Sequence, residues 1–166
     1  MHDITKIKHK IIENPPLNIV LYQPEIPANT GNISRLCGAG EIRLHLIHPL
    51  GFHLDDRRLK RAGLDYWSEV DVKQHESFLV FLKTERVDAD RLVAFSKYAI
   101  DNYTKATVDH GSYLLFGNET SGLPSEIRRS FLCYRIPMWG KVRSLNLSTA
   151  VGIVAYHYLN QLGLFR

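Results

Sequence analysis

Side chains that can bind an anion or polarise a hydroxyl group gather in the segment Ile136–Ala150. Two cations, Lys141 and Arg143, are followed by the hydroxyl of Ser144 and the amide of Asn146. A loop of this composition can present backbone N–H groups, hydroxyls and positive charge at one place. We therefore expect it to form one wall of a site for an anionic or strongly polar ligand.

A second polar loop, Gly117–Gly122, follows the apolar run Ser112–Phe116. Open α/β sheets bind ligands at the carboxyl ends of their strands. At that place the carboxylate of Glu119 could meet a hydroxyl or an amine of a ligand. The alternative interpretation is a glycine-rich turn that binds nothing.

The third polar stretch, Asn29–Arg35, follows the apolar run Leu17–Tyr22 and a proline-containing loop. Asn29 or Thr30 can cap a helix that runs to about residue 38, and the start of such a helix suits an anion. Arg35 lies about one turn further along. A capped surface helix with an ordinary arginine explains the same pattern.

A basic cluster, which comprises Arg57, Arg58, Lys60 and Arg61, lies in a short predicted helix over residues 55–63. It could contact phosphates or be a solvated face, and the sequence favours neither. Across the whole chain 21 lysines and arginines exceed 17 acids, a net charge of +4. This charge permits a polyanionic partner without requiring one.

Apolar runs that alternate with helical patterns position these polar stretches. The predicted strands are Leu17–Tyr22, Ile42–Ile47, Val70–Lys73, Arg91–Ser96, Ser112–Phe116 and a β-like run over Tyr134–Met138. The further predicted helices are His75–Thr84, Pro124–Phe131 and Asn146–Leu162. Alternation of this kind predicts an α/β fold with a mainly parallel sheet flanked by helices.

The 166 residues predict a single domain over residues 17–166, preceded by an irregular extension over residues 1–16. The extension contains Pro15-Pro16, which resists helix and sheet alike. The last predicted helix, Asn146–Leu162, carries more apolar surface than one sheet face needs. We therefore expect it to pack against a partner subunit as well.

A cytoplasmic, metal-free protein is expected from the remaining composition. The amino terminus lacks the apolar core of a signal peptide, and no apolar run approaches about 18 residues. The two cysteines, Cys37 and Cys133, lie far apart in apolar runs, as buried reduced thiols do. The eight histidines show no zinc-like spacing.

Taken together, the three polar stretches resemble the three motifs of the SPOUT superfamily of RNA methyltransferases. The motifs read N-T-G-N-I-S-R, L-L-F-G-N-E-T-S-G-L-P and I-P-M followed by R-S-L-N-L-S-T-A-V. The resemblance spans the chain from Leu17 onward and is greatest to the TrmL type. It implies a C-terminal trefoil knot and a homodimer with active sites at the subunit interface. It also implies methyl transfer from S-adenosylmethionine to the ribose 2'-hydroxyl of the wobble nucleotide of tRNA (position 34, cytidine or carboxymethylaminomethyluridine) in tRNA(Leu) isoacceptors.

The resemblance also assigns roles to particular residues. The S-adenosylmethionine site falls on Phe95, Gly117, Glu119, Ile136 and Ser144, and the catalytic residues are Arg35, Ser144 and Asn146. The candidates for tRNA phosphates are Arg57, Arg58, Lys60, Arg61, Lys141 and Arg143. Because an arginine is normally protonated, we expect Arg35 to bind phosphate or polarise the hydroxyl rather than act as a base.

Two alternatives share the same fold. One is a 2'-O-methyltransferase of the superfamily that acts on rRNA or on another tRNA position, and the other is a non-catalytic RNA-binding protein. A Rossmann-type methyltransferase is not expected, because no G-x-G-x-x-G follows the first strand. The chain departs from the family pattern at Trp139-Gly140-Lys141 and at Asn118.

Overall fold

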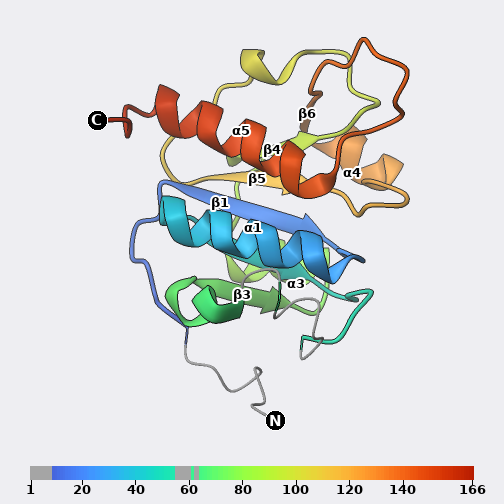
Figure 1. The fold of residues 1–166 in the computed structure, drawn as a ribbon. Coiled ribbons are helices and arrows are strands. Elements are labelled where there is room, and N and C mark those ends of the chain that lie inside the picture. The colour runs from blue at the N-terminus through green and yellow to red at the C-terminus, as the bar shows by residue number, and fades with distance from the viewer. Residues whose placement is uncertain (1–8, 55–60, 62–63) are drawn as a thin grey trace.

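A six-stranded parallel sheet forms the centre of the computed structural model, which describes residues 9–54, 61 and 64–166. The strand order is β3-β2-β1-β5-β4-β6. The strands are β1 (Leu17–Tyr22), β2 (Arg43–Ile47), β3 (Val72–His75), β4 (Leu92–Phe95), β5 (Ser112–Phe116) and β6 (Leu132–Tyr134). The predicted α/β class with a mainly parallel sheet is confirmed (Figure 1).

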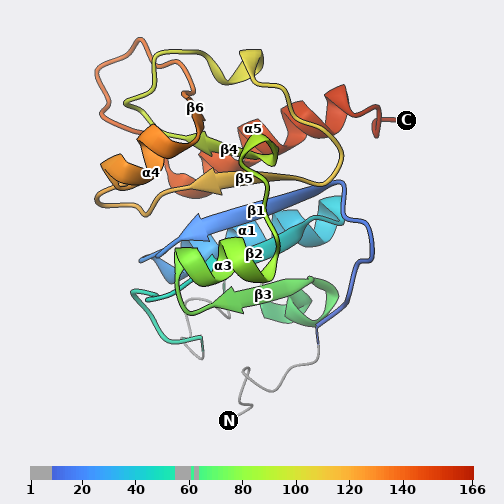
Figure 2. The same ribbon diagram turned by 180° about the vertical axis from the view of Figure 1, so that it is seen from behind.

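Helices cover both faces of this sheet. The α-helices are α1 (Pro27–Gly40), α3 (Phe78–Thr84), α4 (Ser125–Ser130) and α5 (Leu147–Gln161), and the 3-10 helices are η2 (Leu64–Glu69), η3 (Ala89–Arg91) and η4 (Tyr103–Lys105). Figure 1 shows α1 and α5 side by side over one face, and Figure 2 shows α3 and α4 over the other. No helix in the described part of the chain is long and apolar enough to cross a membrane.

The central strand β1 is buried on both faces, which explains its continuous apolar sequence. Leu17, Ile19 and Leu21 pack into the core under α1 and α5, whereas Val20 faces the core under α3. β1 lies between β2 and β5. The order therefore reverses at β1, and ligands of open α/β sheets bind at such a switch point.

Helix α5 is fixed to the connection between β4 and β5 by its buried residue Tyr158. The Tyr158 hydroxyl donates hydrogen bonds to the carbonyl oxygens of Tyr103 and, at 3.5 Å, of Ala106. Burial raises the pKa of Tyr158 to about 12, so the hydroxyl stays a donor at ordinary pH. This contact fixes the carboxyl-terminal part of α5 beside the sheet.

Two predicted strands are misplaced. The prediction of a β-like run over Tyr134–Met138 is wrong, because β6 ends at Tyr134 and Arg135 forms only an isolated bridge with Asn102. Pro137 lacks the N–H that a continued ladder needs. The predicted strand Val70–Lys73 lies two residues too early, because β3 spans Val72–His75.

Residues 9–16 contain neither helix nor strand, and part of this segment is fastened to the domain. The backbone N–H of Ile12 donates to Asp71 at 2.9 Å, and that carboxylate also accepts from Arg43 at 2.8 Å. Lys10 forms an ion pair with Glu41 at 2.7 Å. This lysine is therefore engaged within the protein.

Candidate functional site

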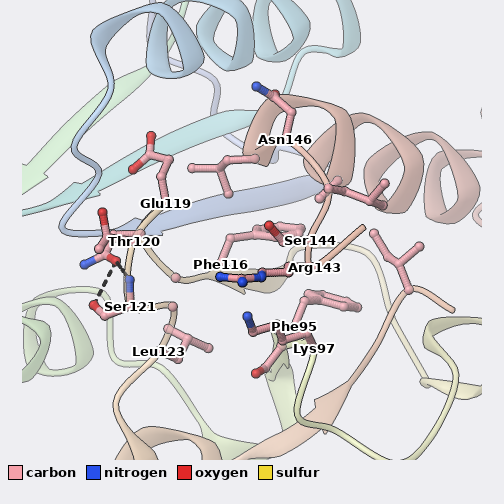
Figure 3. A pocket seen from close by; sticks show the side chains of 18 of the residues that line it. Phe95, Lys97, Phe116, Glu119, Thr120, Ser121, Leu123, Arg143, Ser144 and Asn146 are labelled. Atoms are coloured by element: carbon pink, nitrogen blue, oxygen red, sulfur yellow. Dashed lines mark hydrogen bonds between the residues drawn. The ribbon is translucent and has the colours of Figure 1, made fainter. Parts of the chain in front are cut away.

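A cavity of about 550 Å³ opens at the carboxyl ends of β4 and β5. Its walls come from the segment after β4, the loop after β5 and the segment before α5, with Ile26 and Asn29 of the β1–α1 region (Figure 3). The predicted site residues that line it are Phe95, Gly117, Glu119, Ile136, Arg143, Ser144 and Asn146. The three polar stretches of the sequence thus meet at one cavity, which we call the central pocket.

Aromatic rings from two neighbouring strands form an apolar wall of the central pocket. Phe95 ends β4 and Phe116 ends β5, and their rings stack with centroids 5.0 Å apart at an angle of 18°. Ile136, Leu145 and Ala150 add further apolar surface. A flat apolar wall of this kind suits one face of a planar ring.

The loop after β5 folds back so tightly that position 117 requires glycine. A Cβ atom at Gly117 would lie 2.2 Å from the carbonyl carbon of Gly122 and 2.3 Å from the nitrogen of Leu123. Both are backbone atoms, which cannot move aside cheaply. Asn118 secures the turn, because its Oδ1 accepts from the backbone N–H of Ser121 at 2.8 Å and from the Ser121 hydroxyl at 2.9 Å. The departure at Asn118 therefore has a structural role.

The carboxylate of Glu119 binds the start of helix α1. Oε2 accepts from the backbone N–H of Glu25 at 2.8 Å, and Oε1 accepts from the N–H of Ile26 at 3.1 Å and from Asn29 Nδ2 at 3.2 Å. The predicted cap by Asn29 or Thr30 is wrong, because α1 begins at Pro27 and both residues lie inside the helix. The anion expected at this helix start is a carboxylate of the chain itself.

Asn29 continues this network to helix α5. Its Oδ1 accepts from Asn146 Nδ2 at 3.0 Å, and Asn146 Oδ1 accepts from the backbone N–H groups of Ser148 at 2.9 Å and Thr149 at 3.3 Å. Asn146 is thus the N-cap of α5. The role of Asn29 was missed from the sequence, although its amide lies in the motif N-T-G-N-I-S-R.

The remaining predicted residues lie away from the central pocket or outside the described residues. Arg35 is exposed on α1, with its guanidinium carbon 5.2 Å from the centroid of the Tyr66 ring, and it does not line the pocket. Lys141 is exposed beyond the pocket wall. Arg61 is exposed, and Arg57, Arg58 and Lys60 lie outside the described residues.

The sequence did not single out Lys97 and Tyr98, which line the central pocket and follow Phe95 and Ser96 in the chain. Both residues are exposed, and they lie in a stretch that resembles an ordinary polar loop. Their only sequence signal was a cation and an aromatic residue at the carboxyl end of a strand.

Comparison with known proteins connects this site with RNA methylation. Residues 16–156 match the model of the SpoU rRNA Methylase family. The tRNA (cytidine(34)-2'-O)-methyltransferase of Yersinia pestis is 47% identical over 153 residues, which cover 89% of this chain and 94% of that protein. The enzyme of the same name from Escherichia coli strain K12 is 47% identical over 150 residues, with the same coverage.

Solved structures agree with these sequence relatives. A structure described as giving insights into the 2-OH methylation of C/U34 on tRNA superposes with a TM-score of 0.83 at 50% identity, over 89% of this chain and 97% of that one. An AdoMet-bound rRNA methyltransferase from Sinorhizobium meliloti superposes with a TM-score of 0.80 at 25% identity, over 90% of this chain and 58% of that one.

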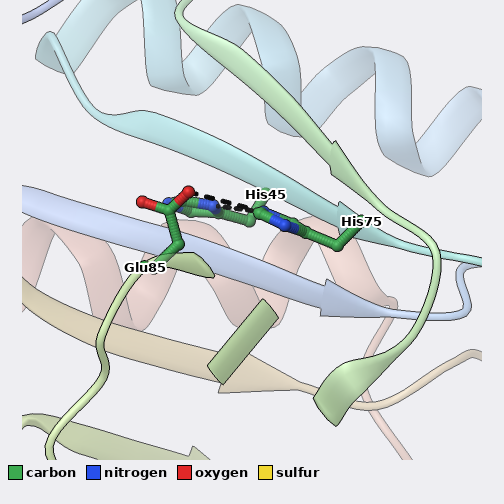
Figure 4. Close-up of side chains that lie close together, drawn as sticks. All are labelled: His45, His75 and Glu85. Atoms are coloured by element: carbon green, nitrogen blue, oxygen red, sulfur yellow. Dashed lines mark hydrogen bonds and ion pairs between the residues drawn. The ribbon is translucent and has the colours of Figure 1, made fainter. Parts of the chain in front are cut away.

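A second group of potential ligands lies on the opposite face of the sheet, under α3. The side-chain ligand atoms of His45, His75 and Glu85 lie within 4.8 Å of one another (Figure 4). Both oxygens of Glu85 are 3.0 Å from Lys73 Nζ, so this carboxylate already has a cation. The sequence predicts no metal site, and this cluster is the one place in the described residues where three such side chains converge.

The hydrogen bonds of this cluster assign the neutral form to His45 and a donor role to Nε2 of His75. Asn18 Nδ2 donates to the carbonyl oxygen of Gly111 at 3.0 Å, so Asn18 Oδ1 must accept from His45 Nε2, 3.1 Å away. His45 Nδ1 is then the acceptor for His75 Nε2 at 3.0 Å. The nitrogens that would face a metal are therefore used by the hydrogen bond between the two rings.

Burial is the main reason that the pKa of His45 is lowered well below its usual value, and nearby His75, Lys73 and Arg43 lower it further. Burial also lowers the pKa of His75, against the opposing effect of Glu85. In the unfolded chain both groups return to about 6.5. The unfolded state therefore binds more protons below that pH, and stability falls as the pH falls.

We predict that the free energy of unfolding, measured by urea titration, falls by about 1–2 kcal/mol between pH 7.5 and 5.5. The variant His45→Gln should show a shallower decrease, because one of the two titrating groups is gone. Replacing the exposed His110 by glutamine is the control and should leave the decrease unchanged. An equally steep decrease in His45→Gln contradicts this assignment.

Proposed function

The chain belongs to the SpoU rRNA Methylase family, and from this premise we propose that it is a tRNA 2'-O-methyltransferase that acts on the wobble nucleotide, position 34. The two relatives named tRNA (cytidine(34)-2'-O)-methyltransferase match this chain over nearly their whole length. The observation that carries the proposal is the central pocket, where the three polar stretches meet around one cavity.

S-adenosylmethionine is the proposed methyl donor, and the residues of the central pocket fit it. A volume of about 550 Å³ lies in the range of pockets for ligands of this size. Phe95, Phe116 and Ile136 provide apolar walls for the planar base, and Gly117 allows the loop after β5 to fold back into the shape that lines the pocket. When bound, this group supplies a methyl carbon attached to a positively charged sulfur.

Glu119 and Asn146 act as positioning residues in this proposal. The Glu119 carboxylate is bound to the start of α1, and the Asn146 amide joins Asn29 to the start of α5. They assist methyl transfer by fixing the walls of the central pocket relative to one another. Alignment of donor and acceptor is a large contribution that a protein makes to a displacement at carbon.

The acceptor ribose is proposed to lie against Ser144 and Arg143, which line the central pocket and are exposed. The Ser144 hydroxyl can accept or donate a hydrogen bond to the ribose, and Arg143 can bind an adjacent phosphate. A protonated arginine can also polarise the 2'-hydroxyl, and this is the role proposed for Arg35.

Arg35 reaches a pocket only if the protein is a homodimer, because it does not line the pocket of its own chain. Large apolar side chains remain exposed on α5 and the residues after it, at Ile153, Tyr156, Leu164 and Phe165. We propose that this surface joins two subunits and that Arg35 of each completes the pocket of the other.

Several finer features belong to the same proposal. The substrates are the tRNA(Leu) isoacceptors with cytidine or carboxymethylaminomethyluridine at position 34, and the enzyme works in the cytoplasm with its tRNA. The C-terminal segment forms a trefoil knot. Lys141, Arg143 and the cluster Arg57, Arg58, Lys60 and Arg61 contact tRNA phosphates.

Nucleoside mass spectrometry of tRNA from a strain that lacks this protein tests the activity. We expect 2'-O-methylation of nucleotide 34 to disappear and to return when the gene is restored. Restoration with Gly117→Ala should fail, because the added Cβ atom collides with the backbone of the loop. Unchanged methylation at nucleotide 34, or a loss confined to rRNA, overturns the assignment.

Mixing two inactive variants tests the shared site. In a one-to-one mixture of Arg35→Ala and Gly117→Ala subunits, half of the dimers are mixed, and each mixed dimer has one intact site. We expect about a quarter of the wild-type rate. Ile136→Asp replaces Gly117→Ala if circular dichroism shows that the latter does not fold. A mixture as inactive as its components shows that Arg35 does not complete the pocket of the other subunit.

A further inference from the structure

A hollow of about 410 Å³ lies beside the central pocket, between α4, β6 and the turn that follows β4. We call it the flanking hollow, and its walls include Tyr98, Ile100, Arg128, Arg129, Phe131 and Leu132. Tyr98 lines both the flanking hollow and the central pocket. A ligand in the hollow is therefore a direct neighbour of whatever reacts in the central pocket.

The walls of the flanking hollow include large apolar side chains that remain exposed. Ile100 is 88% exposed and Leu132, on the edge strand β6, is 54% exposed. Phe131 adds part of an aromatic ring to the same wall. Contiguous exposed apolar side chains mark a surface that binds something.

Tyr98 and Arg128 form an aromatic and cationic platform at the border of the two cavities. The guanidinium carbon of Arg128 lies 4.7 Å from the centroid of the Tyr98 ring, and Tyr98 is still 63% exposed. Both residues are held in place. The Tyr98 N–H donates to the Ser96 hydroxyl at 3.2 Å, and Arg128 Nε donates to the carbonyl oxygen of Leu123 at 3.3 Å. Such platforms stack unpaired nucleobases.

Positive charge dominates the border of the flanking hollow. Arg128 and Arg129 line it, and Lys97 lies 5.4 Å from the Tyr98 ring centroid. The acid of the lining, Asp101, is 3.3 Å from Lys105 and is thus partly neutralised. Cations around an aromatic, apolar hollow fit the phosphate and the base of one nucleotide.

We propose that the flanking hollow binds an unpaired nucleotide adjacent to the methylated one in the substrate RNA. Its base packs against Tyr98, Ile100 and Phe131, and its phosphate contacts Arg128 and Arg129. This inference rests on the proposed function, which places a single-stranded RNA segment in the central pocket. The hollow thereby makes methylation depend on a nucleotide that does not react.

A cycle of protein and RNA changes tests the contact. The substrates are an intact anticodon stem-loop and two altered copies of it. One copy has an abasic nucleotide immediately before position 34, and the other has one immediately after it. We expect Tyr98→Ala to raise KM for the intact RNA by about tenfold, since a stacked base contributes to this extent, and to change kcat less than about twofold. Tyr98→Phe should keep the wild-type KM. On one of the abasic RNAs, Tyr98→Ala should change KM less than about twofold, because the stacking partner is gone.

Further variants separate this contact from effects on the methyl donor and on assembly. Ile100→Asp and Arg129→Ala alter residues that line only the flanking hollow, and both should raise KM for RNA while calorimetry shows unchanged donor affinity. Lys83→Ala removes an exposed cation of α3 as the matched control and should have no effect.

Three results contradict the proposal that the flanking hollow binds a nucleotide. They are an unchanged KM in these variants, a full effect of Tyr98→Ala on both abasic RNAs, and a dimer that dissociates in Ile100→Asp during sedimentation. The last result makes this surface an interface between copies of the chain. If wild-type protein transfers no methyl group to nucleotide 34, the proposed function falls and this inference falls with it.

Discussion

The rest of the site depends on the hydrogen bonds between the carboxylate of Glu119 and the backbone N–H groups at the start of α1. This carboxylate joins the loop after β5 to the loop after β1, and through Asn29 and Asn146 the same network reaches the start of α5. Three segments that are far apart in the sequence are thereby fixed relative to one another. Hydrogen bonds to a charged group in a partly buried place are among the stronger ones in a protein.

The same carboxylate also sets the electrostatics of the central pocket. The start of a helix carries a partial positive charge of roughly half an elementary charge. An uncompensated helix start at Ile26, which lines the pocket, would repel a positively charged sulfur. Glu119 neutralises it, while the exposed cations Lys97 and Arg143 lie where phosphates can approach. One wall can thus accept a cationic donor and another an anionic RNA.

Much of this arrangement follows from the sequence, and the exceptions have physical causes. The strand β5 and the helix α5 were predicted correctly, because an apolar run and an apolar repeat with helical spacing are local signals. The cap of α1 was predicted wrongly, because its partner Glu119 lies more than ninety residues away. Tyr98 was missed for a similar reason, since it lies in the turn after β4 and its partner Arg128 lies in α4, far along the chain.

Urea unfolding of the ligand-free variant Glu119→Gln tests most directly whether this carboxylate organises the site. An amide cannot accept from all three N–H donors, so we predict that the free energy of unfolding falls by about 2 kcal/mol. Glu126→Gln, at an exposed acid of α4, is the control and should change it by less than about 0.5 kcal/mol. If Glu119→Gln unfolds like the wild type and only its affinity for S-adenosylmethionine falls, Glu119 binds the donor directly and the account given for it is wrong.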